Sequence, residues 1–216
     1  MGAGFVSRME DVLDLYAESY DPLHPVVCFD EVPVQLIGER RAPLPMRPGT
    51  PMRIDHEYIR NGTCNIFVAV EPLRGWRRLT VTERRANPDF AEQMRSLVDD
   101  GFPTATRIRV VLDNLSTHTP EALYQTFPAA EARRLMRKIE FHYTPTHGSW
   151  LNMAELELSV FARQCLDQRI PTIERLRELV AAYEARRNAA NATITWQFTV
   201  DKARVKMHAL YPSNPL

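Results

Sequence analysis

Residues 107–114 read RIRVVLDN, an apolar run that ends on two polar side chains. The mainly apolar residues 108–112 are typical of a fully buried β-strand, yet the run stops at Asp113, where burial of a carboxylate is costly. The earlier stretch VVCFDE, residues 26–31, has the same form, because its apolar run leads into Asp30. Two buried strands that each lead into an acid predict a shared site.

The composition is that of an ordinary globular chain. The protein has 216 residues, of which 44% are hydrophobic and 25% are charged. The three cysteines are far apart and form no C-x-x-C motif, so neither a zinc site nor a disulfide framework is indicated. We expect reduced, buried thiols in a cytoplasmic protein. No segment has the apolar length of a membrane span or the pattern of a signal peptide, so no membrane partner is expected.

The formal net charge is zero, but the charges are unevenly distributed along the chain. Residues 1–31 contain seven acids and one arginine, so basic residues are in excess in the remainder. Clusters of this kind can bind a phosphate backbone, although in most proteins such clusters are solvated arginines on helix and loop faces. The candidates for contacts with a DNA backbone are Arg74, Arg77, Arg78, Arg84 and Arg85.

The order of secondary-structure signals predicts a fold class. Strands are expected at 26–31, 32–39, 65–72, 75–83, 107–114 and 138–145, with residues 42–53 as a proline-rich loop. Helices are expected at 5–20, 88–101, 120–137 with a break near Pro128, 150–165, 173–188 and 200–210. Strands first, then strands alternating with helices, predict an α/β protein with a ribonuclease-H-like mixed sheet flanked by helices.

A third acid is needed beside Asp30 and Asp113 if the site holds two divalent ions, because such ions prefer several oxygen ligands. The predicted helix that starts at residue 150 offers both Glu155 and Glu157. At 100° per residue the two glutamates flank the apolar stripe of this helix on opposite sides. Periodicity alone therefore does not choose between them.

Three segments together resemble a known family. VVCFDE, VVLDNLSTHTP and HYTPTHGSWLNMAELE, in this order, are similar to the catalytic blocks of DDE transposases of the mariner-like superfamily, in particular its bacterial insertion-sequence branch. The resemblance covers nearly the whole chain from about Phe5. In that family the third acid is the glutamate three residues after the asparagine of the W-L-N motif. The resemblance thus implies that Asp30, Asp113 and Glu155 are the catalytic and metal-binding acids.

The resemblance also implies an activity and its partners. DDE transposases cleave DNA at transposon ends and join the freed 3′-hydroxyl to target DNA, with two Mg²⁺ ions that Mn²⁺ can replace. The implied partners are the transposon ends, the target DNA and a second copy of the chain in a synaptic homodimer. Full-length relatives carry helix-turn-helix modules ahead of the catalytic domain, so we expect this chain to be the catalytic half and a separate helix-turn-helix half to be a partner.

The expected organisation has three parts. Residues 1–24 form a leading acidic helix and linker, residues 25–190 the catalytic domain, and residues 191–216 a C-terminal helical extension.

Other residues of the motifs are candidates for supporting roles. Asn114 and His118 orient the second aspartate or touch a phosphate, unless they serve as a helix cap and a core histidine. Asn152 belongs to the W-L-N motif that precedes the third acid. Trp150 is expected to anchor the core rather than to stack on a base. Glu31 would face away from Asp30 on a continuing strand, so it is left out of the site.

Two further functions compete with an active transposase domain. The first is a catalytically idle fragment that regulates full-length transposase by dimerisation, and the three intact acids argue against it. The second is a host repair or recombination nuclease of the same fold, and the S-W-L-N-x-x-E block argues against that function.

Overall fold

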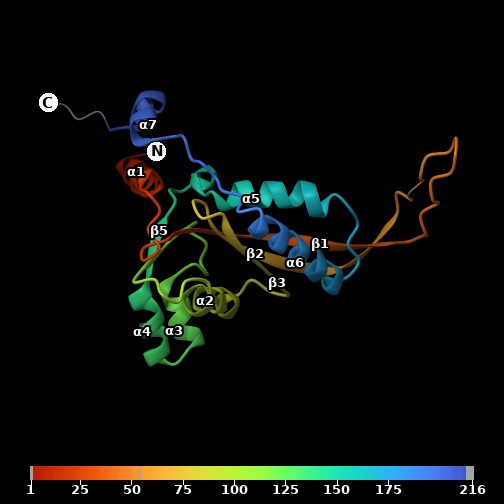
Figure 1. The fold of residues 1–216 in the computed structure, drawn as a ribbon, viewed down its shortest axis with the longest axis horizontal. Coiled ribbons are helices and arrows are strands. Elements are labelled where there is room, and N and C mark those ends of the chain that lie inside the picture. Colours follow the sequence, from red (N-terminus) through yellow and green to blue (C-terminus); the bar gives the residue numbers. More distant parts are fainter. Residues whose placement is uncertain (1, 54, 213–216) are drawn as a thin grey trace.

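The computed structural model describes residues 2–53 and 55–212, which form a mixed sheet covered by helices on both faces (Figure 1). The sheet has the strand order β3-β2-β1-β4-β5. β1 pairs with β2 and β2 with β3 in antiparallel fashion, whereas the β1–β4 and β4–β5 pairs are parallel. The strands are β1 (Val26–Glu39), β2 (Tyr58–Glu71), β3 (Trp76–Thr82), β4 (Ile108–Leu112) and β5 (Ile139–Tyr143).

The helices divide between the two faces of the sheet. They are α1 (Ala3–Ala17), α2 (Asn87–Ser96), α3 (Pro120–Thr126), α4 (Ala129–Lys138), α5 (Ala154–Phe161), α6 (Ile173–Ala189) and α7 (Val200–Lys206). α2, α3 and α4 cover one face, and α1, α5 and α6 cover the other. α2 and α5 each continue into a π-helical turn, Leu97–Gly101 and Ala162–Leu166. None of the helices in the described part of the chain is long and apolar enough to cross a bilayer.

β1 differs from the prediction, because residues 26–31 and 32–39 form one continuous strand of 14 residues. Pro33 lies inside this strand and pairs with Asn65 of β2. The proline is accommodated because β4 pairs only with the first three residues of β1, so none of the strands that the structure describes flanks the other edge of β1 at this position. With β2 starting at Tyr58, β1 and β2 form a long hairpin that extends away from the body of the protein (Figure 1).

Most of the other predicted elements are confirmed, with shifted ends. The helix expected from Trp150 has a 3₁₀ turn at Ser149–Leu151 and becomes α-helical only at Ala154. Trp150 remains 41% exposed and packs edge-on against Phe198 at a centroid distance of 5.7 Å, so the expected core role of Trp150 is wrong. The three cysteines are free and buried, as predicted.

Strand alternation assigns the side chains of β1 to two different cores. Val27 and Phe29 pack with Phe90 of α2 in one cluster, whereas Cys28 packs with residues of α1 and with the start of α5 in another. Asp30 follows Cys28 on the second face, so its side chain is directed towards the layer that contains α5. The face of the sheet on which Asp30 lies is therefore fixed by apolar packing of its neighbours.

A buried ionic cluster joins β3, α5 and α6. The Arg77 side chain has no exposed surface, and its Nε lies 3.0 Å from Glu157 Oε1. Arg187 Nη2 lies 2.9 Å from Glu157 Oε2, and the Tyr183 hydroxyl donates to Glu157 Oε1 at 2.6 Å. Burial opposes the charge of Glu157, yet the hydrogen bonds from Arg187 and Tyr183 outweigh it and hold its pKa below the ordinary value. Arg77 is thus a structural residue, and its prediction as a DNA contact is wrong.

We predict that Arg77→Met lowers the free energy of unfolding by about 3 kcal/mol, because it leaves Glu157 buried with one arginine fewer. Arg74 lies exposed in the turn between β2 and β3, so Arg74→Met should change the free energy by less than about 0.5 kcal/mol. Urea denaturation followed by circular dichroism measures both values. Equal effects of the two substitutions would contradict the structural role of Arg77.

Candidate active site

The parallel pairing of β1 with β4 brings Asp30 and Asp113 to the same edge of the sheet. The last pair of this ladder joins Cys28 to Val111, and each aspartate comes two residues later on its own strand. Asp113 directly follows β4, as predicted. Asp30, in contrast, lies inside β1, because β1 continues along β2 after its pairing with β4 has ended.

Asn152 attaches the start of α5 to β1 beside Asp30. Its Nδ2 donates to the carbonyl oxygen of Phe29 at 2.8 Å and lies 3.4 Å from Asp30 Oδ2. Its Oδ1 accepts from the backbone N–H of Ala154, the first residue of α5, at 3.1 Å. Asn152 is buried, so these contacts are shielded from water. Asn152, predicted to have a supporting role, thus joins β1, which carries Asp30, to α5, which carries Glu155.

The structure distinguishes the two glutamates of α5. Glu155 lies in the first turn of α5, and its charge is one of those that raise the pKa of Asp30. Glu157 points into the buried cluster with Arg77 and Arg187 instead. Glu155 is thus the glutamate beside Asp30, a choice that helical periodicity left open.

Asp30 and Glu155 add negative charge to this edge, and among the described residues neither forms an ion pair. Burial, together with the charges of Glu155, Glu31 and Asp113, raises the pKa of Asp30 to about 7. Within the described ranges, no lysine or arginine forms an ion pair with Asp30 or Glu155. The field at this edge therefore favours a cation.

His118 lies between Asp113 and a second acid that the sequence analysis left out. His118 Nδ1 donates to Asp113 Oδ1 at 2.7 Å, and its Nε2 lies 3.0 Å from Glu31 Oε2. Burial disfavours a charged ring, but the two carboxylates outweigh it and raise the pKa of His118 to about 9. The hydrogen bond from His118 lowers the pKa of Asp113. Glu31 does face away from Asp30, yet it reaches the site through this histidine.

Asn114 is not directed at the second aspartate. Its Nδ2 donates to the carbonyl oxygen of Thr144 at 2.7 Å, and its Oδ1 accepts from Arg8 of α1. Asn114 thus joins the loop after β4 to the end of β5 and to α1.

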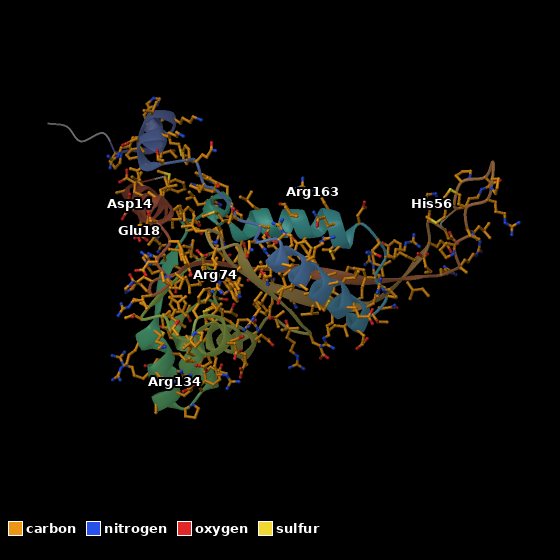
Figure 2. The ribbon with its side chains drawn as sticks, viewed as in Figure 1. Asp14, Glu18, His56, Arg74, Arg134 and Arg163 are labelled. Atoms are coloured by element: carbon orange, nitrogen blue, oxygen red, sulfur yellow. The ribbon has the colours of Figure 1, made fainter. Side chains whose placement is uncertain are left out.

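Of the remaining arginines predicted to contact DNA, Arg85 lies exposed beside one of the acids, and Arg84 is its exposed neighbour in the sequence. Arg84 and Arg85 follow β3, and Arg85 Nη1 lies 3.5 Å from Glu31 Oε1. Arg78 is partly buried and pairs with Asp100, which directs it towards the α2 layer. Arg74 lies in the β2–β3 turn, at the end of the sheet where β1 begins (Figure 2). Of the predicted DNA contacts, Arg84 and Arg85 are thus the exposed arginines next to Glu31, whereas Arg78 and Arg74 lie elsewhere.

Comparison with known proteins identifies the family of this chain. The sequence profile of the family described as DDE superfamily endonuclease matches residues 25–177. The chain belongs to this DDE family. No curated protein matched the sequence significantly.

Solved structures of the Mos1 mariner transposase share the fold of this DDE chain. The Mos1 paired end complex with Mn has 16% sequence identity and a TM-score of 0.56, and covers 89% of this chain. The Mos1 strand transfer complex has 15% identity and a TM-score of 0.58, and covers 88% of this chain. The matches span 59% and 56% of the Mos1 chains. The predicted ribonuclease-H-like fold is confirmed by this similarity.

The donor set of the DDE chain suits Mg²⁺ or Mn²⁺, because Asp30, Asp113 and Glu155 offer hard carboxylate oxygens, and no lysine or arginine of the described residues forms an ion pair with them. In residues 2–53 and 55–212, no three His, Cys, Asp or Glu side chains form a ready-made group around one ion. The fit of a metal ion thus rests on the chemistry and charge of the donors.

We predict opposite effects of two neutral substitutions in EDTA. Asp30→Asn removes a buried charge that lies near other acids, so it should raise the free energy of unfolding by about 1–2 kcal/mol at neutral pH. Asp113→Asn removes the partner of His118 and should lower it. Thermal and urea unfolding in EDTA measure both.

The pH dependence of the Asp30→Asn effect has a defined sign. Because the pKa of Asp30 is raised from 3.8 to about 7, the folded wild type binds more protons than the unfolded chain between these values. The wild type therefore loses stability as the pH rises through this window. The gain from Asp30→Asn should be largest above about pH 7 and should shrink as the pH falls; a gain independent of pH would contradict the strained charge.

Proposed function

We propose that this chain is the catalytic domain of a transposase, which cleaves DNA at transposon ends and joins the new end to target DNA. Asp30, Asp113 and Glu155 are the metal-binding and catalytic acids of this proposal. The observation that supports the proposal is the position of Asp30 and Asp113 at one edge of the sheet, where the charge of Glu155 also acts on Asp30, in a member of the DDE family. Solved structures of Mos1, described as a paired end complex and a strand transfer complex, share the fold.

The proposed cofactors are two divalent ions, Mg²⁺ or Mn²⁺. Mos1 complexes with Mg and with Mn are among the structures that share this fold. When bound, such ions lower the pKa of the attacking water or sugar hydroxyl and stabilise the leaving oxygen.

The chain's own residues then hold and orient the reacting groups. Asn152 fixes the start of α5 on β1, so that Glu155 stays beside Asp30. His118 occupies Oδ1 of Asp113 and so sets the orientation of that carboxylate. Arg84 and Arg85 supply exposed positive charge beside the acids for a DNA phosphate.

The proposed partners are the transposon ends and the target DNA, held by a homodimer in the synaptic complex. A separate helix-turn-helix half would supply recognition of the transposon ends, and the proposed location is the cytoplasm.

We predict that the wild-type chain nicks supercoiled plasmid in the presence of Mn²⁺ and that Glu155→Gln reduces nicking by at least about 100-fold, since a ligand acid is lost. Glu157→Gln is the matched control from the same helix, and it should retain nicking per folded molecule. Circular dichroism verifies that both variants are folded at the assay temperature, which matters because Glu157 belongs to a buried cluster. Equal losses in both variants would mean that both glutamates serve the reaction. Absence of wild-type nicking would favour the idle regulatory fragment.

We also predict weak DNA binding that falls steeply with salt and shows little preference for sequence, because the exposed arginines meet phosphates rather than bases. Arg84→Ala and Arg85→Ala should each reduce the slope of log K against log salt by about 1. Arg74→Ala, at the other end of the sheet, should leave the slope unchanged. Fluorescence anisotropy with labelled duplexes at several salt concentrations measures these slopes, and tight binding to one sequence that persists at high salt would refute the expectation.

A further inference from the structure

Glu31 is a nearly buried carboxylate that the proposed reaction does not use. Its side chain is 5% exposed, and its Oε2 lies 3.0 Å from His118 Nε2. Arg85 lies 3.5 Å from its other oxygen but is itself half exposed, so water screens this pair. A buried carboxylate is costly unless it is well paired, and the partner of Glu31 inside the protein is His118.

His118 has no freedom to leave this position. Its side chain has no exposed surface, and Phe29 and Phe90 pack against the ring with centroid distances of 5.6 and 4.9 Å. Its two nitrogens face Asp113 and Glu31 on opposite sides of the ring. Rotation of the ring would break both contacts and disturb an aromatic cluster of the core.

We propose that Glu31 is a positioning residue of the metal site, which acts on Asp113 through His118. The proposal rests on the proposed function, because it assigns Asp113 as a metal ligand. Asp113 Oδ1 accepts from His118 Nδ1 and, at 3.0 Å, from the backbone N–H of Leu115. Its Oδ2 is thus the oxygen left for a cation. The contact of Glu31 with His118 Nε2 holds the ring in the orientation in which Nδ1 binds Oδ1.

Two substitutions separate this role from a general electrostatic field. Glu31→Gln removes the charge and keeps the length of the side chain, whereas Glu31→Asp keeps the charge but shortens the side chain so that it no longer reaches His118. A positioning role predicts weaker metal binding in both variants. A field effect alone predicts weaker binding in Glu31→Gln and wild-type binding in Glu31→Asp.

The matched control is Glu71, another buried glutamate of the same sheet. It is 1% exposed, and its carboxylate accepts from the backbone N–H groups of Leu73 and Arg74 at the other end of the strands. Glu71→Gln tests for a general effect of replacing a buried glutamate.

The experiment measures Mn²⁺ binding to the full chain by electron paramagnetic resonance of the free ion, at one fixed pH and without DNA. We expect the Kd to rise about ten-fold or more for Glu31→Gln and Glu31→Asp, and to stay at the wild-type value for Glu71→Gln. Thermal melts in EDTA verify folding, and if Glu31→Gln does not fold, Glu31→Asp carries the test.

A double-mutant cycle tests whether Glu31 acts through His118. If Glu31 acts through His118, Glu31→Gln should weaken Mn²⁺ binding no further in a His118→Gln background. Additive losses, or wild-type affinity in Glu31→Asp, would overturn the positioning role and leave the proposed function intact. A wild-type chain that binds no Mn²⁺ would overturn both.

Discussion

The parallel ladder between β1 and β4 is the contact on which the site depends. It consists of three residue pairs that join Val26, Val27 and Cys28 to β4. A slip of one residue would turn the side chains of one strand to the opposite face and separate Asp30 from Asp113. Apolar packing excludes this slip, because Val27 and Cys28 belong to different cores on the two faces. The third acid is then brought to the same edge by Asn152, whose contacts are with β1.

α5 contains two glutamates that are two residues apart and have opposite electrostatic surroundings. Glu157 is fully buried and neutralised by Arg77 and Arg187, so its charge contributes to the packing of α5 against β3 and α6. Glu155 forms no ion pair in the part of the chain that the structure describes, and it adds its charge to that of Asp30. The ion pairs of Glu157 stabilise the fold. The repulsion between Glu155 and Asp30 lowers the stability of the folded state at the proposed cation site. A single helix thus separates structural charge from functional charge.

The sequence predicts the fold and the acids better than the contacts around them. The apolar runs that lead into Asp30 and Asp113 are local patterns, so the strands and their shared edge could be predicted. Glu155 could be chosen only from the W-L-N motif, since the helical period is the same for both glutamates. The links of Arg77 to Glu157 and of Glu31 to His118 join residues that are far apart in the chain, and no local pattern specifies such partners.

β1 is much longer than its pairing with β4, and this difference matters while the protein is being synthesised. β1, β2 and β3 are neighbours in sequence and can pair as soon as they are synthesised, whereas β4 follows more than 20 residues after β3 and Asn152 follows later still. Until then the edge of β1 that faces β4 is unpaired, and beyond Cys28 it has no neighbouring strand among the described residues even after β4 has paired, so it is a template for pairing with another chain. Asp30, Glu31 and Pro33 lie along this stretch of β1, and charges and prolines on an open edge discourage such pairing. Charge and the proline on this part of β1 therefore disfavour pairing of the open edge with another chain.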